Sequence, residues 1–454
     1  MFEFLNFIDL IVPPIFFIII YFISNNIKNR NIEANPSYRY YIPGLMVKLI
    51  GSVSICLVYV FYYKGGDTTT YYHDCAAISK AFLKFPFQML RLTFSNLDMQ
   101  IWYSFDNDTE WPSYAYDEHA FWVDRLCWPL CFVSFRSYIA TTMLLSFICY
   151  QVIWRLYQTL VYEFPTLQKQ MAIAMFFIPS VVFWGSGILK DSITLAAVAL
   201  FVSSVHKIIK LRSQIFKNII LGIIASFLLL KIKPYIFFAL LPGTIIWFAG
   251  LNLSKVENKL LKASFAPMFI FISLITGYFV LGVIGNSLGD YRVDNVLNKA
   301  VTTQQDLKQD YYGGSSFDIG DFDPTIGGIL GKAPVAINAA LFRPYLWEAY
   351  NPGMIASGIE NFILLLSTIY LLLRIKVFNL FRLMFKHHFL FFSVSFSLFF
   401  AFSVGLTTSN FGSLVRYKIP AMPLYVASLF IIYNAYEELK SADKEKVSLQ
   451  FQNV

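Results

Sequence analysis

A carboxylate follows two glycines at the end of a long apolar segment, in the motif Lys64-Gly-Gly-Asp67, which leads into Tyr71. A carboxylate at a membrane surface is partly desolvated, which raises its pKa and suits it to general-base chemistry. Alternatively, Asp67 or Thr68 caps the helix that follows, through the first backbone N–H groups. We therefore predict Asp67 as a catalytic base and Tyr71 as a substrate-binding residue, and the capping role can coexist with that of the base.

A cation and an anion directly follow a helix-breaking turn in the stretch Trp184-Gly-Ser-Gly-Ile-Leu-Lys190-Asp191-Ser192. The turn joins two apolar segments, 171–183 and 193–205. Ionisable residues beside a bilayer core are costly unless paired or solvated, so they are candidates for function. Lys190 is suited to bind a phosphate, and Asp191 to orient that phosphate or an acceptor hydroxyl. The alternative is an ordinary helix start at a polar boundary.

An aromatic stretch later in the chain, Arg343-Pro-Tyr-Leu-Trp347-Glu348, combines an arginine with flat side chains. Arg343 offers a planar fork for a phosphate or a carboxylate. Trp347 offers a face on which a sugar ring can stack, and Glu348 is a further carboxylate. The alternative is an aromatic belt at the membrane interface with a structural Arg–Glu pair.

More cations stand where apolar runs begin or end. Lys231 and Lys233 interrupt two such runs, and Arg416 and Lys418 lead into the last one. Such residues either extend to the interface or bind an anionic headgroup. If these cations converge with those above, they form a basic pocket for a lipid phosphate or pyrophosphate.

Metal and disulfide signals are weak. Asp318-Ile-Gly-Asp321-Phe-Asp323 has closely spaced oxygen ligands but lacks a full calcium-loop pattern. The five cysteines show no metal spacing; Cys127 and Cys131 would either pair in an oxidising compartment or share one helical face. We predict no metal ligands and no certain cofactor, and leave dependence on a divalent metal open.

Membrane-spanning helices are expected to position these residues. The chain is 57% hydrophobic and only 14% charged, with a mean hydropathy of +0.57, far from a soluble domain. We predict an all-α, polytopic transmembrane helical bundle with about eleven spans, in one domain over residues 1–436 and followed by a tail over 437–454. The predicted spans are 8–24, 44–63, 137–160, 168–185, 191–208, 217–232, 234–251, 264–284, 355–374, 388–406 and 418–436.

The charges predict an orientation. Lys and Arg cluster in alternate loops and in the tail, which the positive-inside rule places in the cytoplasm, with the N-terminus outside. The net charge of +8 lies in such loops and therefore does not indicate a nucleic-acid partner. Two long segments, 64–136 and 285–352, are then external loops. In the first, residues 76–94 and several aromatic and basic side chains predict an interfacial helix that binds anionic lipid. These side chains are Trp102, Trp111, Trp122, Trp128, Lys80, Lys84 and Arg91.

Two motifs, Gly66-Asp67-x-x-x-Tyr71 and Arg416-Tyr417-Lys418-Ile-Pro420-x-x-Pro423, resemble those of C-type (GT-C) membrane glycosyltransferases. The stretches around Lys190-Asp191 and Arg343-Pro344-x-x-Trp347-Glu348 resemble segments of bacterial envelope-polysaccharide membrane proteins of that kind. The resemblance implies a sugar donor carried on polyprenyl phosphate or pyrophosphate, Asp67 as base, and the cations as phosphate ligands. The chain departs from the pattern because its Asp follows the second span rather than the first, and because its first loop lacks a clear Asp-Asp or Glu-x-Asp pair.

We therefore predict an integral-membrane glycosyltransferase on the external face of a bacterial inner membrane, with a lipid-linked sugar donor and membrane lipid as partners. A polymerase or ligase of lipid-linked polysaccharide is the first alternative, and there Arg343 and Arg416 matter more than Asp67. A transporter or flippase of lipid-linked sugars is the second, which expects ionisable residues within spans and broken helices. The sugar, the acceptor and the oligomeric state stay open.

Overall fold

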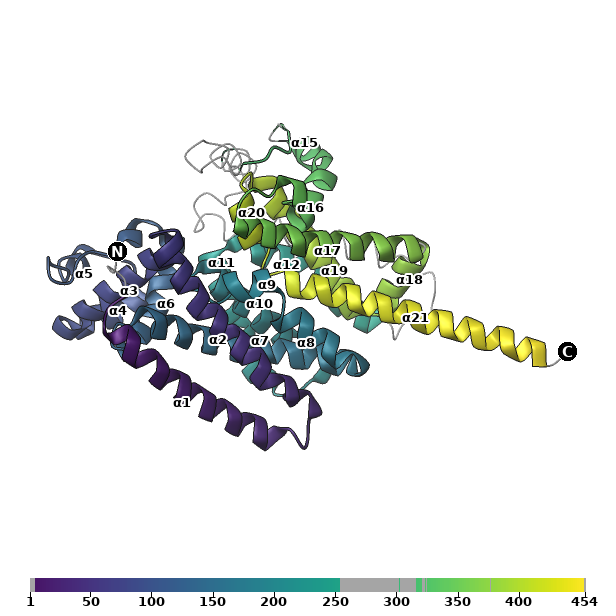
Figure 1. Ribbon diagram of the computed structural model, residues 1–454, viewed down its shortest axis with the longest axis horizontal. Coiled ribbons are helices and arrows are strands. Elements are labelled where there is room, and N and C mark those ends of the chain that lie inside the picture. Colours follow the sequence, from purple (N-terminus) through teal and green to yellow (C-terminus); the bar gives the residue numbers. More distant parts are fainter. Residues whose placement is uncertain are drawn as a thin grey trace. The chain divides into compact units, whose positions relative to one another are not determined.

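A computed structural model describes residues 5–253, 316–320, 325–375 and 377–452, together with residues 302 and 323. These residues are helical or irregular, with one isolated bridge between Ser316 and Asn410, so the all-α class is confirmed for them (Figure 1). Within this part of the chain, eight helices are long and apolar enough to cross a membrane. A bent pair, Phe411–Tyr417 with Met422–Glu438, makes a ninth if it counts as one span. These are the helices of an integral membrane protein.

Two predicted spans need comment. Residues 168–185 do not form one helix, because the chain breaks into α8 (Gln168–Phe176) and α9 (Pro179–Trp184). Proline at the first position of α9 lacks an N–H and keeps the preceding residue extended, which ends α8 before it. The predicted span 264–284 lies outside the described residues, as do residues 285–301 and 303–315 of the predicted loop 285–352.

The chain divides into two compact units. The first unit consists of Met1–Val161 and Met175–Lys233, and the second of Tyr162–Ala174 and Pro234–Val454. Each unit carries part of the predicted site and is described by itself. The prediction of one domain over residues 1–436 stays a prediction.

The first unit contains long helices and a group of shorter ones inserted between two of them. The long ones are α1 (Ile8–Asn31), α2 (Tyr41–Leu57), α7 (Tyr138–Glu163), α10 (Lys190–His206) and α11 (Ile215–Ile232). Between α2 and α7 lie α3 (Asp67–Lys84), α4 (Pro86–Phe94), α5 (Met99–Trp102) and α6 (Glu118–Val133). Helices α3 and α6 pack on each other through buried side chains that include Cys75, Ile78, Phe121 and Cys127. This packing holds α3, whose first residue is Asp67, against α6.

The second unit is built around α19 (His388–Thr407), whose Phe392, Phe396 and Phe400 stack along one face. Glycine at Gly405 lets α16 (Ala333–Phe342) approach closely, since a Cβ there would lie 1.9 Å from the carbonyl oxygen of Ala336. The other helices of this unit are α12 (Pro234–Leu253), α15 (Ile326–Gly331), α17 (Pro352–Arg374), α18 (Val377–Lys386), α20 (Phe411–Tyr417) and α21 (Met422–Gln452). Most of the predicted tail thus continues α21 as helix.

Candidate functional site

The two glycine-containing motifs of the first unit are neighbours. A Cβ on Gly187 would lie 3.3 Å from Cγ2 of Thr68, so the turn before α10 touches the start of α3. Gly66, at φ +124°, lies against the ring of Tyr59, which in turn packs near Trp184 with ring centroids 6.5 Å apart. The structure therefore brings the residue next to Asp67 into contact with the turn that leads to Lys190.

Asp67 is the first residue of α3 and is partly exposed. Gly66, rather than Asp67 or Thr68, occupies the N-cap position. The hydroxyl of Tyr114 donates a hydrogen bond to Oδ1 of Asp67 at 3.2 Å, and the Tyr114 ring packs on buried Tyr71 with centroids 4.6 Å apart. A carboxylate in the first turn of a helix is favoured by the helix dipole. Asp67 is thus held as a positioned carboxylate beside two tyrosines.

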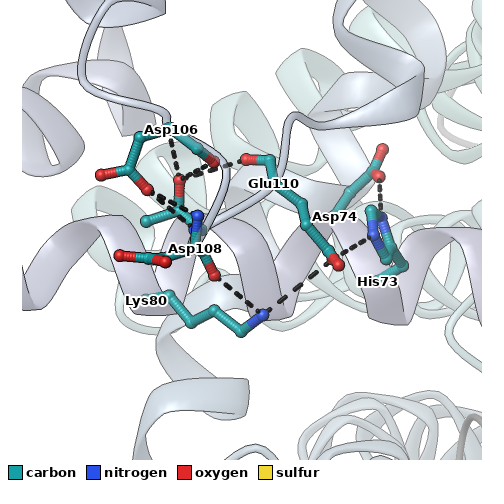
Figure 2. Close-up of polar contacts among 7 residues, drawn as sticks. His73, Asp74, Lys80, Asp106, Asp108 and Glu110 are labelled. Carbon is teal, nitrogen blue, oxygen red and sulfur yellow. Dashed lines mark hydrogen bonds and ion pairs between the residues drawn. The ribbon is translucent and has the colours of Figure 1, made fainter.

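Asp74 holds the loop that carries Tyr114. Its fully buried carboxylate accepts the backbone N–H groups of Ser113 and Tyr114 at 2.7 and 2.8 Å. His73 lies between Asp74 and Glu110, with ring nitrogens 3.2 and 2.6 Å from their carboxylate oxygens (Figure 2). The hydrogen bond with Asp74 holds the pKa of His73 above its ordinary value. Neither His73 nor Tyr114 was singled out from the sequence, because their partners are distant along the chain.

The turn between α9 and α10 is buried, and side chains from other helices bind its carbonyl groups. Lys48 of α2 donates to the carbonyl of Gly185, and Ser146 of α7 donates to that of Ser186 at 2.6 Å. Non-helical backbone at membrane depth is stable only where partners of this kind satisfy it. Lys48 is buried within the candidate span Pro36–Tyr62 and was not predicted as a site residue. The sequence pattern that could have indicated Lys48 is a single lysine inside an otherwise apolar run.

The three lysines predicted to bind phosphate in the first unit all take part in ion pairs. The pairs are Lys190 with Asp117 at 3.2 Å, Lys231 with Glu118 at 2.9 Å, and Lys233 with Asp191 at 2.5 Å. The third pair is buried, with side chains 7% and 0% exposed, whereas the acids of the other two pairs are about half exposed. This end of the unit is therefore a network of alternating charges, in which an anionic ligand would compete with carboxylates for the ammonium groups.

The network also shifts the pKa values of the two acids at the start of α6, Asp117 and Glu118. Burial alone would raise the pKa of Asp117, but the Lys190 ammonium and the backbone N–H of Ala120 bring it below its ordinary value. The hydrogen bond from Lys231 lowers the pKa of Glu118. Both carboxylates therefore stay ionised near neutral pH and remain partners for the lysines.

Asp124 lies further along α6 and is fully buried. Neither of its carboxyl oxygens has a hydrogen-bond partner among the described residues. Burial raises its pKa well above the usual range, with the charge of Asp74 acting in the same direction and that of Lys190 opposing it. Sequence reasoning did not single it out, because its position in a packed helix is not visible from spacing.

In the second unit, Arg343 forms a two-pronged ion pair with Glu348. Its Nε and Nη2 lie 3.1 and 2.5 Å from the two carboxylate oxygens. The guanidinium also lies 4.4 Å from the ring centre of Phe317. The structural Arg–Glu pair that the sequence left open as an alternative is therefore present. Trp347 is 73% exposed and stacks on Tyr345 with ring centroids 4.8 Å apart.

Lys418 lies at the 67° bend between Phe411–Tyr417 and Met422–Glu438. It is 2% exposed, and its ammonium donates to the carbonyl of Leu341 at 3.2 Å and to Oδ1 of Asn361 at 2.6 Å. Arg416 is less buried, with its guanidinium 6.0 Å from the ring centre of Tyr417. Lys418 is thus a buried lysine that binds the end of α16 and the side chain of Asn361, and it does not extend to the membrane surface.

The predicted site residues fall into two sets. Asp67, Tyr71, Lys190, Asp191, Lys231 and Lys233 belong to the first unit, and Arg343, Trp347, Glu348, Arg416 and Lys418 to the second. The expectation that both sets line one cavity stays a prediction. Within the described part of the chain, no group of three or more His, Cys, Asp or Glu residues is placed to hold a metal ion. All five cysteines are free and buried, including Cys127 and Cys131.

In comparisons with known proteins, no family model, no curated protein and no solved structure matches this chain.

Proposed function

We propose that the protein is an integral-membrane glycosyltransferase that moves a sugar from a polyprenyl-phosphate-type donor to an acceptor on the external face of a bacterial inner membrane. One observation supports this most. Asp67 is a partly exposed carboxylate, fixed by Tyr114, beside the turn that leads to the Lys190–Asp117 pair. In glycosyl transfer from a lipid phosphate, a base can accept the proton of the acceptor hydroxyl and a cation can stabilise the departing phosphate.

In this proposal the acceptor oxygen attacks the anomeric carbon while Asp67 accepts the proton of the acceptor hydroxyl. The bond between the anomeric carbon and the phosphate oxygen breaks, and the lipid phosphate leaves with the electron pair. Lys190 binds the departing phosphate and stabilises the charge that develops on it. Tyr114 keeps the Asp67 carboxylate oriented through its hydroxyl.

The test compares Asp67→Asn with Asp108→Asn. Asp108 is an exposed acid between α2 and α7 that forms an ion pair with Lys84. Purified protein in lipid vesicles receives labelled polyprenyl-phosphate hexoses and pentoses, and sugar transfer is measured. We expect Asp67→Asn to lower the rate by about 10² to 10⁴, the usual contribution of a general base, and Asp108→Asn to leave it unchanged. Equal activity of the two variants would refute the assignment of Asp67.

A transporter or flippase of lipid-linked sugars is a second candidate, and two observations favour it. Lys48 lies within a candidate span and binds a carbonyl at a helix break, and Lys418 lies at a bent helix pair. Ionisable residues and broken helices inside spans are typical of transporters. Vesicles that move a labelled lipid-linked sugar between leaflets without transferring the sugar would favour this candidate over the glycosyltransferase.

The polymerase or ligase alternative depends on Arg343 and Arg416 as phosphate ligands. Arg343 binds Glu348 through two nitrogens and both side chains are 19% exposed, whereas Lys190 makes one contact with Asp117, which is 49% exposed, so a phosphate would displace Glu348 less easily than Asp117. This alternative therefore ranks below the other two.

A further inference from the structure

Helix α4 (Pro86–Phe94) exposes an apolar face. Phe87 is 84% exposed, Leu90 49% and Phe94 86%. Residues at these spacings lie on one side of a helix. Leu83, near the end of α3, is 63% exposed and extends the same kind of surface. Large side chains exposed together in this way indicate contact with a further apolar phase.

The opposite face of α4 is firmly packed. Met89 and Leu92 are fully buried in the core of the first unit. Trp128 of α6 donates its indole N–H to the hydroxyl of Thr93 at 3.0 Å. Because these contacts fix the rotation of α4, the outward position of Phe87 and Phe94 is set by the fold.

The cations beside this face are neutralised within the protein. Lys84 lies 2.6 Å from Asp106 and 3.2 Å from Asp108, and Arg91 pairs with Asp98. Lys80 lies 4.0 Å from a carboxylate oxygen of Glu110. The sequence predicted that Lys80, Lys84 and Arg91 bind an anionic headgroup, but this role would require breaking these pairs. Of the four tryptophans expected at the interface, Trp122 and Trp128 are only 8% and 3% exposed, whereas Trp111 is 39% exposed and Trp102 is partly exposed. The surface that remains is hydrocarbon and not a basic patch.

The position of α4 in the chain identifies what covers this face. It lies between two candidate spans, Pro36–Tyr62 and Tyr138–Glu163. Asp9, in the first turn of the candidate span α1, accepts hydrogen bonds from Ser137 and Ile139 at 2.6 and 3.1 Å. The segment that contains α4 thus leaves and rejoins the bundle at helix ends, where the apolar part of a bilayer begins.

We propose that α4 is an interfacial helix that inserts Phe87, Leu90 and Phe94 into the leaflet at the α2–α7 connection. An amphipathic helix of this kind lies in the plane of the membrane with its apolar face among the acyl chains. The internal pairs of Lys84 and Arg91 make insertion independent of anionic lipid. The helix anchors the segment between α2 and α7 to the membrane surface.

The test uses Phe87→Cys and Phe94→Cys, each labelled with an environment-sensitive fluorophore. Asn107→Cys, an exposed polar position in the same segment, is the matched control. The native cysteines are buried, so labelling is directed to the new position. Each variant is reconstituted in phosphatidylethanolamine–phosphatidylglycerol vesicles, and again in vesicles of phosphatidylcholine alone. Quenching by acyl-chain nitroxide lipid and by aqueous iodide is measured, and an unchanged melting midpoint confirms that each variant is folded.

For an inserted helix, we expect lipid nitroxide to quench the labels at 87 and 94 about fivefold more than the label at 107, in both lipid mixtures, with iodide showing the reverse. Iodide quenching at 87 and 94 equal to that at 107 would overturn the proposal. Protection from both quenchers that disappears at one protein per vesicle would also overturn it, since a second copy would then cover α4. Loss of lipid quenching in phosphatidylcholine would overturn the independence from anionic lipid.

Discussion

The buried pair between Asp191 and Lys233 allows a quantitative prediction. The two side chains are 0% and 7% exposed and lie 2.5 Å apart. Removing one member leaves the other charge buried without this partner, which typically costs about 3–5 kcal/mol. The pair of Lys231 with Glu118 is more exposed, at 31% and 53%, and pairs of that kind contribute about 1 kcal/mol or less. We therefore expect Asp191→Asn to lower the free energy of unfolding by about 3–5 kcal/mol, and Glu118→Gln by under about 1 kcal/mol.

The assay is unfolding in mixed micelles by titration with sodium dodecyl sulfate, followed by circular dichroism. The double variant Asp191→Leu with Lys233→Met replaces the pair by apolar groups, and such replacements are often neutral or stabilising. We expect it to recover most of the stability lost in Asp191→Asn. If that double variant is stable but inactive in sugar transfer, the pair acts in the chemistry and not only in the fold.

Two results would contradict this reasoning. The first is a cost for Asp191→Asn no larger than that for Glu118→Gln, because the pair would then be solvated. The second is a double variant as unstable as the single one, because burial of an unpaired charge would then not explain the loss.

Two further predictions concern pH. Burial raises the pKa of Asp124, so above about pH 4 the native state keeps a proton that the unfolded state has released, and stability falls as pH rises. Asp124→Leu should raise the melting midpoint more at pH 8 than at pH 5; equal gains would contradict this. The hydrogen bond with Asp74 raises the pKa of His73. The contribution of protonated His73 to stability is therefore fully present below about pH 6.5 and is lost as the pH rises through the raised pKa. Hydrogen exchange of the Ser113 and Tyr114 amides, corrected for intrinsic rates, should then increase with pH, and His73→Gln should remove that increase; an unchanged pH profile in the variant would argue against this role.

Much of the helical architecture is predictable from the sequence, because span length and hydropathy are local properties. The window that predicts α7 needs no information beyond residues 137–160, and the helix is found at Tyr138–Glu163. The break between α8 and α9 was missed because an apolar window does not register that Pro179 begins a new helix.

The site is less predictable, because pairing depends on distant residues. The sequence selects Lys231 and Asp191 as ionisable groups beside apolar runs. It does not show that Lys231 binds Glu118, 113 positions away, or that Tyr114 reaches Asp67 across 47. Lys190, Lys231 and Lys233, which were considered as phosphate ligands, therefore proved to be members of ion pairs. Asp124 was overlooked because its burial is a tertiary property, whereas Lys48 had a signal in the sequence as a single lysine in an apolar run.

The bond between Lys48 and the carbonyl of Gly185 has a consequence for how the protein is made. The two residues are 137 positions apart, and chains grow at about 5–20 residues per second, so Lys48 leaves the ribosome roughly 7–27 s before its partner. A lysine at the centre of an inserted helix costs about 2.5–3.5 kcal/mol while it waits. Helices α8 and α9, of nine and six residues, are too short to cross the bilayer singly. Lys48 is therefore without this partner until the turn that follows α9 has been made, and α9 packs against α2, which is already present when α9 is synthesised.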